Sequence, residues 1–113
     1  MHLASRYGHL DIVKYLVEEC HCNVEAKDKD GWTPLHKVSY DGHLDIVKYL
    51  VEECHSNIEA KDNYECTPLH RASNNGHFDV VKYLVEECHA QITDRIISDA
   101  RSRSVKEYLK SKR

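Results

Sequence analysis

Residues 9–28 read HLDIVKYLVEECHCNVEAKD and residues 43–62 read HLDIVKYLVEECHSNIEAKD, so one segment occurs twice at an offset of 34 residues. The two copies differ only at Cys22/Ser56 and at Val24/Ile58. A third copy begins at His77 with HFDVVKYLVEECHAQI. Self-similarity at a fixed period of this length is the signature of a repeat array. We therefore expect one supersecondary unit stacked several times, and we interpret every periodic residue first as a structural part.

The charges are unevenly distributed along the 113 residues, whose formal net charge is -3. Residues 1–90 contain 9 Lys and Arg against 16 Asp and Glu, whereas residues 91–113 contain 7 against 3. The body is acidic and the tail is basic. This balance argues against a general polyanion-binding protein, and the length suits one small domain.

Cysteine usage indicates a reducing environment. The chain has 5 cysteines, an odd number, and Cys20, Cys54 and Cys88 share one repeat position. A set of this kind is not a disulfide framework, so we expect reduced thiols in an intracellular, cytoplasmic protein. The first residues, MHLASRYGHL, show no signal-peptide pattern. No segment approaches the roughly 18 apolar residues that a membrane span needs.

One repeat can be followed from residue 30 to residue 63. Asp30-Gly31 signals a turn, and Thr33-Pro34 is a typical start of a helix. This short first helix should run to about Tyr40 and end at Gly42, which takes up a left-handed backbone readily. After Gly42 the pattern predicts a second helix.

The second helix should begin near Leu44 and carry one apolar stripe. The stripe consists of Leu44, Val47, Leu50 and Val51. On the wet side we expect Asp45, Lys48, Glu52 and Glu53. From Cys54 to Asp62 the chain should leave the helix and extend to the next turn.

This unit resembles the ankyrin repeat. The resemblance is carried by DGWTPLH at 30–36, GHLDIVKYL at 42–50 and EAKD at 59–62, and the next copy keeps TPLH at 67–70 and VVKYL at 80–84. The tetratricopeptide repeat shares the period, but it gives no reason for Thr-Pro-Leu-His. The resemblance implies an all-α, ankyrin-like helix-turn-helix solenoid with β-turn tips, of about three repeats plus a short C-terminal capping helix pair.

Two departures from the ankyrin pattern stand out. An extra residue lies around 54–57, where the family usually has a glycine that closes the second helix. In the next unit, Tyr64-Glu65 replaces the Asp-Gly of the turn, and we expect that turn to be distorted.

We expect a single ankyrin-repeat domain over residues 1–113. Its units are approximately 1–28 (truncated), 29–62 and 63–93, followed by a cap at 94–113. In the cap, Ile97 and Ala100 should take the places of Leu69 and Ala72, and Ser104 should cap the last helix. Met1 aligns with Leu35, inside a first helix, so the first unit should expose apolar surface through which the chain could self-associate.

The nine histidines are all periodic, which makes a structural role the first interpretation. The ankyrin resemblance implies that the histidine of Thr-Pro-Leu-His bonds backbone in the neighbouring turn. Cys20, His21 and Cys22 could chelate a metal locally, but equivalent positions in stacked helices lie about 8–10 Å apart. Zinc needs its donors within about 2.0–2.3 Å of one centre. We predict no metal and no cofactor.

Catalytic motifs are lacking in the sequence. It contains no Gly-rich phosphate loop, no His-Glu-x-x-His motif and no nucleophile placed beside a base. We predict that the protein is not an enzyme and has no small-molecule substrate.

The repeats differ from one another mainly at the turn tips and in the first helices. In ankyrin-like stacks these parts line one concave surface, where partners usually bind. The predicted partner-binding residues are Arg6, Tyr7, Asp30, Trp32, Lys37, Tyr40, Asp41, Tyr64, Glu65, Arg71, Asn74 and Asn75. Neutral drift at exposed positions is the alternative. Against drift, the exposed side that carries Lys48, Glu52 and Glu53 hardly varies.

The sequence therefore predicts non-catalytic recognition of a protein partner through the concave face. The second hypothesis is an accessory role, in which the basic C-terminal helix docks on an acidic partner, nucleic acid or a membrane surface. The net charge disfavours nucleic acid and membranes.

Overall fold

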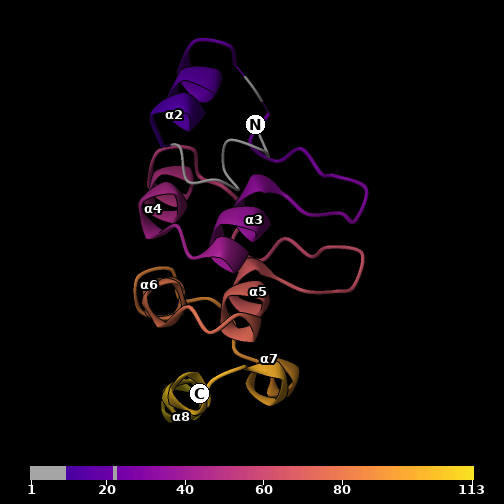
Figure 1. Cartoon of the computed structure of the whole chain (residues 1–113), viewed down its shortest axis with the longest axis vertical. Helices are drawn as coiled ribbons and strands as arrows, with labels where there is room; N and C mark the ends of the chain where they lie inside the picture. Colours follow the sequence, from indigo (N-terminus) through magenta and orange to yellow (C-terminus); the bar gives the residue numbers. More distant parts are fainter. Residues whose placement is uncertain (1–9, 22) are drawn as a thin grey trace.

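The computed structural model describes residues 10–21 and 23–113. This part of the chain is helical and contains no strand, so the all-α prediction is confirmed. The helices are α2 (Leu10–Glu18), α3 (Pro34–Asp41), α4 (Leu44–Glu52), α5 (Pro68–Asn74), α6 (Phe78–Glu86), α7 (Asp94–Asp99) and α8 (Arg103–Lys112). They stack in two columns, a first column of α3, α5 and α7 and a second column of α2, α4, α6 and α8 (Figure 1).

The first column is set by local capping. The Thr33 hydroxyl accepts a hydrogen bond from the His36 amide, and the Thr33 amide donates to His36 Nδ1, which satisfies two backbone donors at the start of α3. Thr67 and Thr93 cap α5 and α7 through their hydroxyls. Gly42 ends α3 with a φ of 79°. A β-carbon at Gly42 would lie 2.5 Å from the His77 ring, so only glycine fits there.

The second column buries a wider stripe than the one predicted. In α4 the buried residues are Ile46, Val47, Tyr49 and Leu50, whereas Leu44 and Val51 are only half-buried. The reason is that α4 packs against α3 and also against α2 and α6. A helix held on three sides buries residues that a single apolar face does not include.

In the cap, two expected residue roles prove wrong. Ile96 is buried at 3% exposure, while Ile97 is only half-buried, because Thr93 starts α7 and turns Ile96 toward α5. Ser102 caps α8 by accepting a hydrogen bond from the Val105 amide, so Ser104 lies inside the helix.

The turn at Tyr64-Glu65 is not distorted, contrary to expectation. Asp62 Oδ1 accepts hydrogen bonds from the Tyr64 and Cys66 amides at 2.8 and 3.0 Å. Asp28 Oδ1 makes the same two bonds in the preceding turn. Glu65 supplies the left-handed residue that the turn needs, with a φ of 63°.

The loops after the second helices also place a residue other than glycine in the left-handed conformation. His21, His55 and His89 have φ values of 55°, 54° and 55°. Histidine is one of the residues that enter the left-handed region more often than most. These three histidines therefore stand where a glycine would close the helix.

A side-chain pair recurs between neighbouring helices of the second column, and we call it the tyrosine–glutamate ladder. The Tyr49 hydroxyl donates to Glu18 at 2.7 Å, and the Tyr83 hydroxyl donates to Glu52 at 2.6 Å. Tyr108 on α8 bonds Glu86 on α6 in the same manner. The ladder joins each second helix to the one before it.

Candidate functional site

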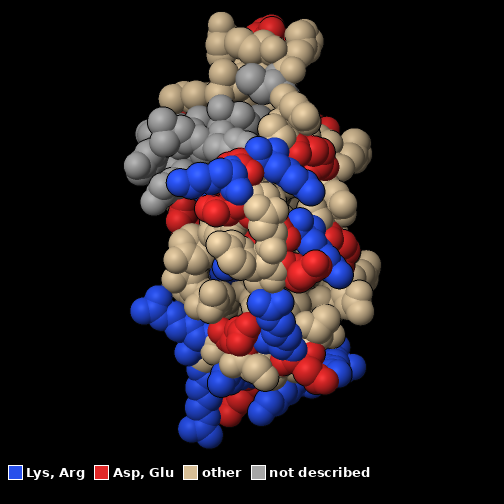
Figure 2. All heavy atoms as spheres, turned by 90° about the vertical axis from the view of Figure 1, so that its right-hand side faces the viewer, with Lys and Arg blue, Asp and Glu red and all other residues tan. Residues whose placement is uncertain are grey.

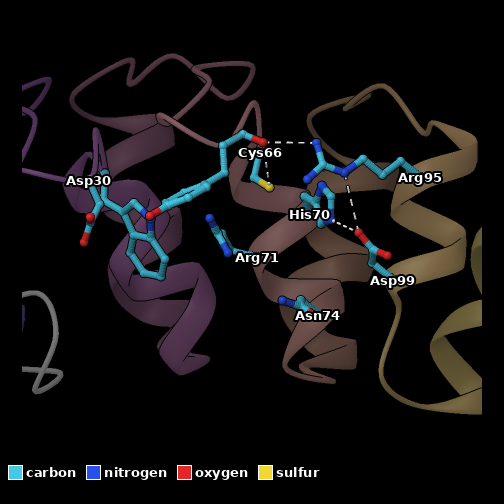
Figure 3. A pocket seen from close by; sticks show the side chains of 9 residues that line it. Asp30, Cys66, His70, Arg71, Asn74, Arg95 and Asp99 are labelled. Carbon is cyan, nitrogen blue, oxygen red and sulfur yellow. Dashed lines mark hydrogen bonds and ion pairs between the residues drawn. The ribbon is translucent and has the colours of Figure 1, made fainter.

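The turns at residues 28–33 and 62–67, together with α3, α5 and α7, form one surface that we call the turn face. It contains a pocket of about 360 Å³ that reaches from the turn at 28–33 across α5 to α7 (Figure 3). The pocket is lined by Asp30, Trp32, Tyr64, Cys66, His70, Arg71, Asn74, Arg95 and Asp99. A smaller hollow of about 180 Å³ lies beside it, lined by Asp30, Trp32, Lys37, Tyr40 and Asp41.

Cations and aromatic rings alternate across the turn face. Lys37 Nζ and the Arg71 guanidinium each lie 4.7 Å from the Trp32 ring centroid. Arg71 also lies 5.9 Å from the Tyr64 ring, and Tyr40 meets Trp32 edge-on with the ring centroids 5.3 Å apart. Such contacts are worth about 0.5–1 kcal/mol each when exposed and more when desolvated. The stack holds Trp32 in place between two charges.

The two cations of this stack are anchored from behind. Arg71 Nε and one terminal nitrogen donate to the same Asp62 oxygen at 2.9 and 2.7 Å, and the Asp62 side chain is fully buried. Burial pushes the pKa of Asp62 up, but hydrogen bonds from the Cys66 amide and from Arg71 outweigh it and hold the pKa below its usual value. Lys37 pairs with Asp28 in the same way at 2.9 Å. The cation thus differs between the two repeats, Lys37 in one and Arg71 in the other, whereas its partner is an aspartate in both.

Four lining residues were missed by the comparison of copies. Cys66 stands where the preceding turn has Trp32 but is buried, so it is not among the predicted residues, and His70 recurs with the repeat. Arg95 and Asp99 belong to the cap, where the 34-residue register is lost. Arg95 is 54% exposed, donates to the Tyr64 carbonyl at 3.0 Å and lies 3.6 Å from Asp99. No comparison of copies could have identified the two cap residues.

The histidines of the first helices have different partners. His36 Nε2 donates to the Cys66 carbonyl at 2.9 Å, which is the backbone contact that the ankyrin resemblance implied. His70 Nε2 donates instead to the Asp99 carboxylate at 2.9 Å. Burial lowers the pKa of both rings, and Asp99 offsets this only partly at His70. Both rings are therefore set up to be neutral connectors between layers.

The described residues of the predicted site fall into three groups. The pocket and the smaller hollow bring together Asp30, Trp32, Lys37, Tyr40, Asp41, Tyr64, Arg71 and Asn74. Glu65 is exposed at the turn, outside both hollows. Asn75 bonds a residue on either side of its own repeat, because its side-chain amide donates to the Tyr40 carbonyl and accepts from Arg101. Arg6 and Tyr7 lie outside the described residues.

The turn face contains ion pairs and one buried thiol. Arg71 pairs with Asp62, Arg95 lies 3.6 Å from Asp99, and burial raises the pKa of the Cys66 thiol. Within residues 10–21 and 23–113, no three His, Cys, Asp or Glu side chains come together to hold a metal ion. Cys22, which belonged to the local chelate considered above, is not among these residues. No described helix has the length and apolar character needed to cross a membrane.

Comparison with known proteins gives two kinds of match. A family model described as ankyrin repeats matches residues 1–96 in three copies. Alpha-latrotoxin-Lt1a of Latrodectus tredecimguttatus and alpha-latrotoxin-Lh1a of Latrodectus hasselti are each 60% identical to this chain over 35 residues. The matched segment is 31% of this chain and 2% of either toxin, so the chain spans a very small part of these relatives.

Proposed function

The chain belongs to the ankyrin repeat family, and from this premise we propose that it is a non-catalytic protein–protein interaction module whose partner binds on the turn face. Ankyrin repeats are generally protein–protein interaction modules and are typically not catalytic. The family supplies only this general role, and the binding surface and its residues are our own proposal.

The observation that carries the proposal is the convergence of the variable positions on adjoining hollows. Tyr64 is 59% exposed beside the anchored Arg71, and Trp32 lines both the pocket and the smaller hollow, as Asp30 does. Tyr, Trp and Arg are the residue types enriched in binding hot spots. An anchored arginine loses little conformational entropy when a partner contacts it.

The uniform outer side of the second helices, which carries Lys48 and Glu52, has a structural explanation of its own. The tyrosine–glutamate ladder gives Glu52 a structural role, and Lys48 lies 5.7 Å from the Tyr83 ring. Packing between layers therefore explains why Glu52 and Lys48 are uniform without any partner. The proposal rests on the geometry of the turn face itself.

Tyr64→Ala is the sharpest test, because Tyr64 is exposed whereas Trp32 is packed between two cations. A partner would be captured from extract with the intact chain, purified, and titrated against the intact chain and the variant. We expect the variant to bind about 1–3 kcal/mol more weakly, with an unchanged helical circular dichroism spectrum.

Tyr15→Ala is the matched control, since Tyr15 is also a tyrosine with 59% exposure but lies on α2, away from the turn face. Equal binding by Tyr64→Ala and the intact chain would reject the turn face. A loss confined to Tyr15→Ala would place the partner on α2.

The basic end of the molecule favours the second candidate function, docking of α8 on an acidic surface. Lys and Arg side chains gather at the end formed by α7 and α8 (Figure 2). The basic residues there include Arg101, Arg103, Lys106, Lys110, Lys112 and Arg113. If this end were the binding site, affinity would fall steeply with salt and would be reduced by Lys106→Gln with Lys110→Gln, while Tyr64→Ala would have no effect.

A further inference from the structure

The smaller hollow of the turn face combines two aromatic rings with two carboxylates. Trp32 and Tyr40 meet edge-on, and Asp30 and Asp41 line the hollow with them. Its volume of about 180 Å³ suits one long side chain. Tyr40 is 36% exposed, so its ring can be contacted from outside. Aromatic rings and carboxylates are the groups that attract a cation.

Both aspartates stand on a well-held backbone and carry carboxylates that no described group engages. The Asp30 amide donates to Asp28 Oδ1, and the Asp30 carbonyl accepts from the Asn63 amide. Asp41 is the last residue of α3, where the helix dipole disfavours a negative charge. Within residues 10–21 and 23–113, neither carboxylate takes part in a hydrogen bond or an ion pair. A cation beside Asp41 would also meet the negative end of the α3 dipole.

The cations beside these carboxylates, in contrast, already have partners. Both signs of charge are visible on the side toward which the turns project (Figure 2), so pairing decides which sign is available. Lys37, which lines the same hollow, lies 2.9 Å from Asp28, and the two side chains are 21% and 22% exposed. Arg71 is 13% exposed and bonded to the fully buried Asp62. An incoming anion at Arg71 would compete with Asp62 and leave a buried carboxylate without its partner.

Two other cations of the turn face lie outside the smaller hollow. Arg95 lines the pocket, where it donates to the Tyr64 carbonyl and lies 3.6 Å from Asp99. Lys29 is exposed at the turn and lines neither hollow. The smaller hollow therefore offers uncompensated negative charge to a partner.

From this balance we infer that the partner presents a basic segment, one arginine or lysine of which enters the smaller hollow. The inference rests on the proposed function, because it names the chemistry of the partner that binds the turn face. The cation would pair with Asp30 and Asp41 and lie against the Tyr40 ring. Arginine suits this position better than lysine, since its planar guanidinium can pair with a carboxylate and stack on a ring at once.

The test uses random peptides displayed on phage, selected on the full chain and, in parallel, on a variant that carries Asp30→Asn with Asp41→Asn. We expect the peptides selected on the intact chain to share a position enriched in arginine or lysine. The same position should show no such enrichment in peptides selected on the variant. The urea midpoint of the variant should be equal to that of the intact chain or higher, because Asp41 opposes the helix dipole.

A double-mutant cycle then identifies the contact. The strongest peptide is synthesised with its basic residue intact or replaced by glutamine, and each form is titrated by fluorescence anisotropy. The peptide change and Asp41→Asn should each weaken binding by about three- to tenfold, and together they should weaken it little more than either alone. Glu53→Gln is the matched control, since it removes the same charge from the exposed outer side of the stack and should leave binding unchanged.

Four results would overturn the inference: a selection without a basic position or without binding peptides, additive effects in the cycle, a lower urea midpoint of the double variant, and acidic peptides whose binding Arg95→Gln weakens. The proposed function is judged separately with the same peptides. Peptides that lack a basic position but need Tyr64 would reject this inference and leave the turn face as the binding surface. Peptides that bind Tyr64→Ala as well as the intact chain would count against the turn face itself.

Discussion

Glu65 adopts a backbone conformation that residues with a β-carbon rarely enter. Its φ of 63° matches the 79° of Gly31, the residue in the same place of the preceding turn. The sequence suggested that this turn would be distorted, but the two amide bonds to Asp62 hold its shape. The left-handed region costs an ordinary residue about 1–2 kcal/mol. The backbone strain is therefore confined to Glu65. The sequence pattern of the turn cannot show that strain.

Replacing Glu65 with glycine should therefore stabilise the protein. We expect a gain of about 0.5–1 kcal/mol, because relief of the backbone cost exceeds the extra entropy of glycine in the unfolded chain. The exposed ion pair to Lys61, with its atoms 4.0 Å apart, is worth little. Urea unfolding followed by circular dichroism would measure the change.

Gly31→Ala is the matched control with the opposite sign. Its β-carbon would lie 2.6 Å from Asn63 Oδ1 in a left-handed backbone, so this change should destabilise. A Glu65→Gly protein that unfolds at lower urea than the parent would contradict the assignment of strain.

Helix boundaries were the features best predicted from sequence, because the Thr-Pro start signal and the Gly stop signal each act on the backbone only a few residues away. Thr33 and Gly42 both behave as expected in α3. The ladder could not be predicted in this way, since it joins residues 31 positions apart and depends on how neighbouring helices are rotated. The cap was harder still, because the register that guided every other residue ends before α7.

The ladder makes Tyr83→Phe a stability test of the second column. Burial first, and then the bond to Glu52, raise the pKa of Tyr83. Loss of the hydroxyl should cost about 1 kcal/mol in urea unfolding, since the hydrogen bond goes to a charged but partly hydrated group. Tyr15→Phe in the same chain should cost nothing measurable.

A double-mutant cycle identifies the cause of the Tyr83→Phe effect. If the hydroxyl acts through Glu52, the effect should be smaller in a Glu52→Gln background. Additive changes would mean that the Tyr83 hydroxyl acts through a group other than Glu52, such as the neighbouring Cys88 thiol.

Across the whole molecule, neutral histidines connect the layers of the first column, with His36 joined to the next turn and His70 to α7. Their folded-state pKa values lie below the ordinary value of 6.5, first because of burial. Groups near His36 include Asp62 and Arg71, and those near His70 include Asp99, Arg95 and Arg71. Unfolding therefore takes up protons once the pH falls below about 6.5.

The protein should lose stability between pH 7.5 and pH 5.5. The stabilisation from neutral His36 and His70 is complete above the unfolded pKa of about 6.5 and declines as the pH falls through and below it. Asp28 and Asp62, whose pKa values are lowered, add their loss only in a separate window below about pH 4. The urea midpoint measured at both pH values would show the decline.

His70→Gln should narrow the difference between the two pH values, whatever it does to stability at pH 7.5. Equal midpoints at pH 7.5 and 5.5 in the parent would show that the buried rings are not protonated on unfolding. The turn-face proposal would be unaffected by that result.

Only part of the candidate site was predicted from the sequence. The predicted residues are those within the 34-residue repeat. Tyr64 and Arg71 were found because each has a counterpart 34 residues away with which to compare it. Arg95 and Asp99 complete the same pocket from the cap, where no counterpart exists. The ion pairs that anchor Arg71 and Lys37 also lay beyond sequence reasoning, since they depend on how each turn folds back on its helix.

The stack around Trp32 gives the molecule an intrinsic optical probe. Trp32 is the only tryptophan of the chain, and its indole is bordered by Lys37, Arg71 and the Tyr40 ring. The energy of the indole excited state depends on nearby charge, so its emission wavelength responds when either cation moves. The same contacts that hold Trp32 in place therefore make the fluorescence of the unlabelled protein a direct report of what occupies the pocket.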